Sequence, residues 1–92
     1  MNQESENLEG WKPVGTITHY FSNISVAVIE LEGNLNKGDT IRVVGGEDTD
    51  FEQAVDSMEM EHEKIDSAKS GDVIGMKVDQ KVREGYRVYK MQ

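Results

Sequence analysis

The sequence predicts an all-β fold, and three observations point to it. A glycine beside a charged residue introduces a run of β-branched or aromatic residues three times, at Gly38, Gly71 and Gly85. Residues 12–20 and 25–31 carry the alternation of strands, and the second run is apolar on both faces at its centre. With 92 residues a single core is only marginally sufficient, so a closed barrel without free edges is an economical architecture.

The remaining elements follow in order along the chain. Residues 22–23 form the turn between the first two strands, and residues 32–38 form a loop with a short extended piece. Further strands are expected at residues 40–44, 51–60, 73–78 and 86–89, with a polar turn at 45–50 and a bulge or bend at Ser57-Met58. Residues 62–69 are expected to be a connecting loop, with room for one helical turn. In the strand at 73–78, Gly75 leaves space for another backbone to approach.

The segment from Ala54 to Ala68 also supports a competing prediction. Its apolar residues recur at the three-to-four spacing of an amphipathic helix, in a background rich in Glu, Lys and Met. The order of its motifs favours a strand instead. Residues 57–60 read Ser-Met-Glu-Met, and Ala68, Gly71, Asp72 and Gly75 form an Ala-x-x-Gly-Asp-x-x-Gly string before a further apolar run.

These motifs resemble the second domain of translational GTPases such as elongation factor Tu and elongation factor one-alpha. The resemblance extends over residues 14–90 and implies a small closed antiparallel β-barrel, here as a stand-alone translation-factor-like protein. In that family the matching strand and turn lie close to the pocket that receives aminoacylated tRNA. The resemblance therefore gives the first group of candidate partner-binding residues, which comprises Glu59, Met60, Gly71, Asp72 and Val73. A similar barrel is also found at the C-terminus of collagenase-like peptidases linked to RNA modification.

Charge gives a second group of candidates. The chain has 10 Lys and Arg against 18 Asp and Glu, a net charge of −8 and a pI near 4.6. Because phosphate contacts supply most non-specific affinity, this balance predicts weak or no binding of free nucleic acid. The C-terminal part is nevertheless locally basic, and an electrostatic partner is expected to contact Lys77, Lys81, Arg83 and Arg87.

The sequence offers no complete catalytic or ligand-binding motif. There is no phosphate-binding glycine loop, so no nucleotide cofactor is expected. Glu59-x-x-His62 matches half of a di-iron helix motif, and a solvated acidic loop explains it better. His19 is expected to be structural. We therefore predict no catalytic residues, no cofactor and no bound metal. Trp11 is expected either to cover one end of the barrel or to contact a partner.

The N-terminal region and the composition bear on location. Residues 1–10 are expected to be a disordered acidic tail, and residues 11–92 a single barrel domain. The start of the chain has no secretory character, no apolar run is long enough to span a bilayer, and cysteine is absent. These features predict a cytoplasmic protein that does not contact a membrane.

Three functions are compatible with these observations. The first is a non-catalytic adaptor that binds a protein or ribonucleoprotein partner, such as a translation GTPase, the ribosome or an RNA-modification enzyme. The second is a separately encoded accessory domain of an RNA-modification or collagenase-like peptidase-type enzyme. The third is a metal-dependent enzyme that uses His62 and its acidic neighbours, although the sequence contains no complete set of catalytic residues. The sequence favours the first and leaves the oligomeric state open.

The expected core comprises Val14, Ile17, Val26, Val28, Ile29, Ile41, Val43, Val55, Met58, Val73, Ile74, Met76 and Val88.

Overall fold

A computed structural model describes residues 8–92, and all of its regular elements are strands. Their bounds are β1 Trp11–Phe21, β2 Val26–Leu31, β3 Leu35–Asn36, β4 Thr40–Gly45, β5 Thr49–Ala54, β6 Met58–Met60, β7 Glu63–Ile65, β8 Ser67–Ala68, β9 Val73–Lys77 and β10 Arg87–Met91. The predicted all-β fold is confirmed. Residues 58–60 are extended, as the motif order predicted, and the helical spacing of residues 54–68 does not produce a helix.

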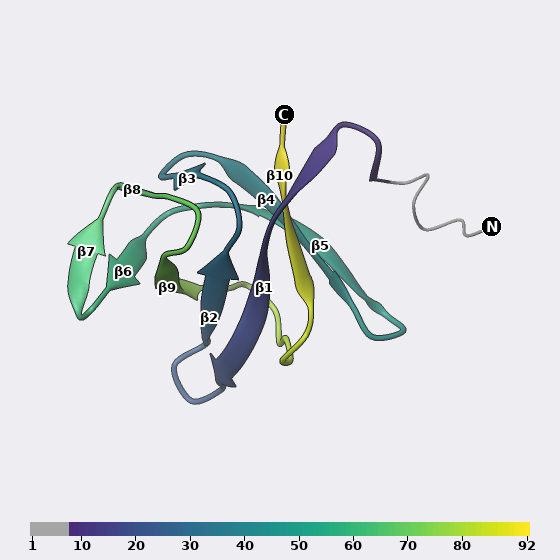
Figure 1. Ribbon diagram of the computed structural model, residues 1–92. Coiled ribbons are helices and arrows are strands. Elements are labelled where there is room, and N and C mark those ends of the chain that lie inside the picture. Colours follow the sequence, from purple (N-terminus) through teal and green to yellow (C-terminus); the bar gives the residue numbers. More distant parts are fainter. Residues whose placement is uncertain (1–7) are drawn as a thin grey trace.

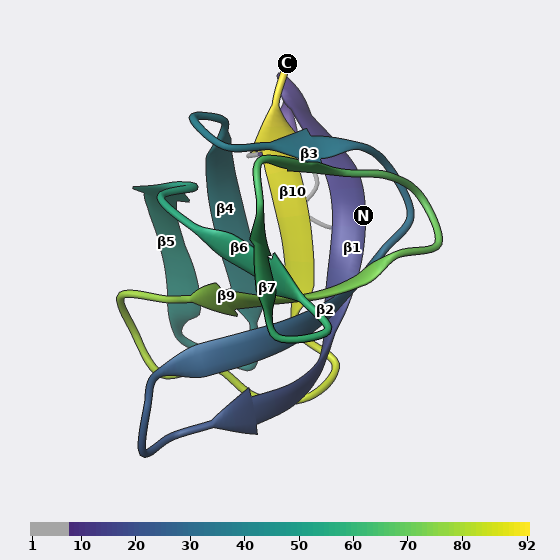
Figure 2. The ribbon, with the colours of Figure 1, turned by 90° about the vertical axis from the view of Figure 1, so that its left-hand side faces the viewer.

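Eight strands form one antiparallel sheet in the order β5-β4-β10-β1-β2-β9-β6-β7, while β3 and β8 form a separate two-stranded sheet. The long strand β1 joins the two parts of the large sheet, since it pairs with β10 in its first half and with β2 in its second. Its register shifts between Pro13 and Gly15 and again between Ile17 and His19. Bulges bend and twist a strand, and β1 accordingly curves through the molecule (Figures 1 and 2).

The sheet is strongly curled, but the expected closed barrel is not confirmed. Strands β5 and β7 end the sheet, and within residues 8–92 no strand ladder joins them. A side chain instead links β5 to the end of β9 and to the segment that follows it. The amide of Gln53 donates from Nε2 to the Lys77 carbonyl at 3.0 Å, and its Oε1 accepts from the Asp79 N–H at 2.8 Å.

The core fills the inside of the curled sheet and contains most of the expected residues. Three expectations differ: Val26 and Val28 are only half-buried, and the prediction for Val73 is wrong because this side chain is 50% exposed. Successive residues of a strand point to opposite faces, so Ile74 lies in the core while its neighbour Val73 points to the outside. The core also includes residues that the sequence did not single out, which are Ala27, Leu31, Leu35, Phe51, Ala68, Val78 and Val82.

Two expected features of the loops have clear outcomes. Residues 62–69 are not a simple loop, since β7 pairs with β6 and β8 pairs with β3. The three glycine-led strand starts are confirmed as one repeated device. Gly38, Gly71 and Gly85 all have φ between 93° and 96°, and in each case the next residue donates its N–H to the carbonyl three positions earlier. This is the geometry of a type II turn, which requires a positive φ at its third residue.

The N-terminal expectations are only partly within the described chain. Residues 1–7 of the expected tail lie outside the described residues. Trp11 belongs to β1, where it pairs with Met91 and is half-buried beneath the Arg42 guanidinium, 5.6 Å from the ring centroid. The ring is thus partly covered by the Arg42 side chain. Within residues 8–92 no helix is long and apolar enough to cross a membrane.

Candidate functional site

An apolar hollow lies on the outward face of β2, β9 and β6. Because Ala27 and Ile29 point into the core, the alternate residues Val26 and Val28 point outward. On the neighbouring strand Ile74 and Met76 point inward, so Val73 and Gly75 share the outward face. Two exposed side chains add to one end, Phe21 from the last residue of β1 and Ile24 from the turn between β1 and β2. We call these six residues, Phe21, Ile24, Val26, Val28, Val73 and Gly75, the apolar groove. Together with Ile74, Glu59, Glu61 and His62 they line a hollow of about 430 Å³.

The exposure of the apolar groove is unusual for large side chains. Phe21 is 44% exposed, Ile24 53% and Val73 50%. Single exposed apolar residues are common on any protein, but a contiguous set that lines one hollow is typical of an interaction surface. The apolar groove is therefore our candidate binding surface.

The rim of the apolar groove is acidic. It is formed by Glu59 on β6 and by Glu61 and His62 in the β6–β7 turn. Met60 pairs with Glu63, so the turn has two residues, and both have a positive φ, 54° at Glu61 and 69° at His62. A two-residue hairpin of this kind favours Asn and Gly, since a Cβ is disfavoured in the left-handed region. The turn thus holds two charged or polar side chains beside the groove at a conformational cost.

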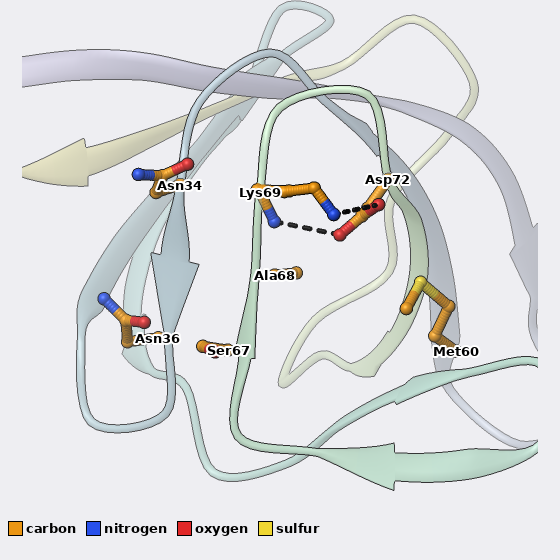
Figure 3. A pocket seen from close by; sticks show the side chains of 7 residues that line it. All are labelled: Asn34, Asn36, Met60, Ser67, Ala68, Lys69 and Asp72. Carbon is orange, nitrogen blue, oxygen red and sulfur yellow. Dashed lines mark hydrogen bonds and ion pairs between the residues drawn. The ribbon is translucent and has the colours of Figure 1, made fainter.

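A second, polar hollow of about 360 Å³ lies between the β3–β8 pair and β6 (Figure 3). Its lining residues are Asn34, Asn36, Met60, Ser67, Ala68, Lys69 and Asp72. The Asp72 carboxylate accepts the Lys69 backbone N–H at 2.9 Å, and its other oxygen lies 3.9 Å from Lys69 Nζ. Asp72 therefore fixes its own turn, and this role occupies the carboxylate facing the hollow.

The structure separates the first group of candidate residues between these two hollows. Glu59 and Val73 line the apolar groove, whereas Met60 and Asp72 line the polar hollow. Gly71 is the left-handed residue of the turn that joins β8 to β9.

The basic C-terminal candidates lie on β9, in the segment between β9 and β10, and on β10. Lys81 and Arg83 line a shallow hollow with His19 and Tyr20, whereas Lys77 ends β9. On β10, Arg87 forms an ion pair with Glu32, with Nη2 3.4 Å from Oε2.

The most strongly perturbed ionisable pair lies away from both hollows. Arg42 on β4 donates from Nε and Nη2 to the two Asp50 carboxylate oxygens, each at 2.8 Å. This hydrogen bonding lowers the pKa of Asp50 and, against partial burial, raises the pKa of Arg42. The pair joins adjacent strands and also positions the guanidinium over Trp11. We assign it to structure rather than to a site.

No group of three or more His, Asp or Glu side chains within residues 8–92 is arranged to hold a metal ion. His19 lies 3.6 Å from the Glu84 carboxylate, measured from Nδ1, and packs edge-on against Phe21 with ring centroids 4.4 Å apart. Sequence reasoning overlooked Phe21 and Ile24 as site residues. Their signal was present, since two large apolar residues flank the polar turn at 22–23.

Comparisons with known proteins give a consistent result. Residues 9–87 match the family model of the peptidase family U32 C-terminal domain. An uncharacterized protease of Methanocaldococcus jannaschii is 38% identical over 79 residues, which are 86% of this chain and 19% of that protein. The chain therefore spans about a fifth of the length of this curated relative.

Solved structures show the same fold. The C-terminal domain of a Geobacillus thermoleovorans protein described as a U32 peptidase superposes with a TM-score of 0.82 at 18% identity, covering 88% of this chain and 93% of that one. Its selenomethionine variant gives a TM-score of 0.80, with 84% and 96% covered. The resemblance to elongation factor Tu and elongation factor one-alpha is wrong as an assignment of family, and so is the description of the chain as translation-factor-like. The motifs behind it describe turns and strands that this other family also contains.

Proposed function

The chain belongs to the family of peptidase U32 C-terminal domains, and from this premise we propose that it acts as a non-catalytic accessory domain of a U32 peptidase-type enzyme. The observation that carries the proposal is the extent of the match. It covers residues 9–87, corresponds to a C-terminal domain, and accounts for 19% of the curated relative. The larger remainder of such an enzyme is the natural place for the chemistry.

The surface of the chain supports the same function. An accessory domain needs a face that contacts the rest of its enzyme or the substrate, and the apolar groove provides such a face. Interface cores are typically apolar and aromatic with a polar rim, and Phe21, Ile24 and Val73 beside Glu59 and Glu61 follow that pattern. The partner is thus proposed to be a polypeptide of a U32-type enzyme.

Affinity purification from the native host tests the proposal. The chain carries a small tag at the C-terminus, is expressed from its own locus, and is recovered with its bound proteins for quantitative mass spectrometry. We expect a U32 peptidase-type protein in near-stoichiometric amount, and an untagged strain supplies the background. Enrichment of ribosomal proteins or a translation GTPase, with no U32-type protein, contradicts the proposal and favours an adaptor that binds those partners.

A further inference from the structure

We propose that the apolar groove binds an extended segment of the partner polypeptide that is apolar at its centre and carries lysine or arginine at its flanks. The inference rests on the proposed function and specifies how the accessory domain recognises its enzyme. It is carried by three features of the described residues, which are the exposed side chains, the glycine in the floor and the charge of the rim.

The groove has enough exposed apolar surface to bind such a segment. Phe21, Ile24 and Val73 are each about half exposed, and Val26 and Val28 are half-buried between them. Covering these side chains removes apolar surface from water, which is the main favourable contribution to association. The hollow encloses about 430 Å³, which suits a few side chains of a peptide and not a whole protein domain.

Gly75 is the feature that points to close contact with another backbone. It lies in the middle of β9, opposite Val28 on one side and Glu59 on the other. Neither its φ nor a lack of space requires a glycine, since its φ is not positive and an added Cβ would meet only Val26 Cγ1, at 3.4 Å. A glycine in a strand interior weakens the strand, so an unneeded one marks a place where a ligand or a backbone approaches.

Charge complementarity selects the type of segment. Glu59 and Glu61 stand on the rim, and the exposed Glu30 lies opposite Val73 in the ladder. With a net charge of −8, the chain as a whole also attracts cations. Lysine or arginine flanking the apolar centre satisfies these carboxylates, whereas a nucleic acid or an acidic peptide is repelled. Lys77 pairs with Val26 in the ladder but is not among the residues that line the groove.

Photo-crosslinking in the native host tests this contact. Benzoylphenylalanine replaces Ile24, which is 53% exposed and lies outside the core, and a second strain carries it at Glu47 in the β4–β5 turn as a control. Irradiation is expected to join position 24 to a polypeptide segment that contains apolar residues and lysine or arginine. Position 47 should give no such product. Cross-linking of position 24 to nucleic acid, to a second copy of the chain, or to no macromolecule overturns the inference.

Two variants probe the groove itself. Gly75→Phe fills the floor and keeps good β-propensity, so the fold is retained while the cross-link falls roughly tenfold, equivalent to about 1.4 kcal/mol of binding. The double variant Glu59→Lys with Glu61→Lys should lower the cross-link by about the same factor. Its matched control, Glu47→Lys with Asp48→Lys, makes the same change of charge on another exposed turn and should have no effect.

The groove inference and the proposed function can fail independently, and the experiments distinguish the two failures. If the unmodified chain recovers a U32-type enzyme but Gly75→Phe recovers it equally well, the groove inference fails and the proposed function stands. If no U32-type enzyme is recovered, yet position 24 still cross-links to a basic and apolar segment of another protein, the proposed function fails and the groove inference stands.

Discussion

Replacing glycine by alanine should change the stability of the protein in opposite directions at two strand positions. Gly45 at the end of β4 and Gly75 in β9 both lack a positive φ, so alanine is compatible with the backbone at each. Their surroundings differ. A Cβ at Gly45 would lie 2.2 Å from Cδ1 and 2.3 Å from Cγ of Tyr86, whereas at Gly75 the nearest atom is Val26 Cγ1 at 3.4 Å.

The sizes of the two effects follow from these contacts. Replacing glycine by alanine restricts the unfolded chain, so Gly75→Ala should stabilise the protein by about 0.4 to 1 kcal/mol. At Gly45 the clash involves the base of an aromatic ring, which cannot swing away on its own. The backbone of Tyr86 is also held, since its carbonyl accepts the Ile17 N–H at 2.9 Å and its N–H donates to the Arg83 carbonyl at 3.2 Å. Gly45→Ala should therefore cost about 1 to 3 kcal/mol, as overpacked sites do.

Urea and thermal unfolding of the three proteins measure the difference. For a chain of this size 1 kcal/mol shifts the Tm by roughly 4 to 8 °C, so the two variants should fall on opposite sides of the parent protein. In a Tyr86→Ala background the penalty of Gly45→Ala should disappear, giving a coupling energy of about 1 kcal/mol or more. If Gly45→Ala is as stable as the parent, or remains equally destabilising without the Tyr86 ring, the packing argument is wrong.

Three further predictions concern stability. Ile74→Ala, in the core, should cost about 2 to 5 kcal/mol, whereas Val28→Ala, in the half-buried groove, should cost about 1 kcal/mol or less; equal losses in urea unfolding would contradict the assignment of faces. Hydrogen bonds from the Arg42 guanidinium lower the pKa of Asp50, so the stability that the Asp50 carboxylate contributes is present above about pH 4 and is lost as the pH falls through the lowered pKa. Unfolding measured across pH should therefore show Asp50→Asn less stable than the parent at neutral pH and equally stable in acid. The difference should be under about 1 kcal/mol because the carboxylate is half exposed. Asp39→Ala and Asp72→Ala should each cost about 0.5 to 1.5 kcal/mol, because each carboxylate accepts one backbone N–H of its turn; a loss of partner binding with Asp72→Ala alone would instead make the polar hollow the working surface.

The strands were predictable because the turns that separate them have strict local requirements. A type II turn needs a positive φ at its third position, and glycine supplies it at 38, 71 and 85. This requirement depends on a few adjacent residues, so the sequence displays it directly. The helical spacing of residues 54–68 was less informative, since cross-strand pairing with β4 and β9 overrides it.

The assignment of faces was harder, for a reason connected with the groove. Residues 26–29 and 73–74 are apolar at consecutive positions, so both faces of β2 and β9 carry apolar side chains. Periodicity cannot tell which face meets the core when neither is polar. Only the pairing of these strands shows that Ala27, Ile29 and Ile74 face inward and that the second apolar face is left open to solvent.

The mistaken family has a physical explanation in the Gly-Asp turn. In Lys69-Ser70-Gly71-Asp72 the glycine supplies the left-handed residue, and the aspartate carboxylate accepts the N–H three positions earlier at 2.9 Å. The turn Asn36-Lys37-Gly38-Asp39 repeats both contacts within the same chain, with the carboxylate bond at 2.8 Å. A motif that recurs for such local reasons reports how a strand begins and not which protein contains it. Gly75, which no local requirement explains, is for that reason the better guide to function.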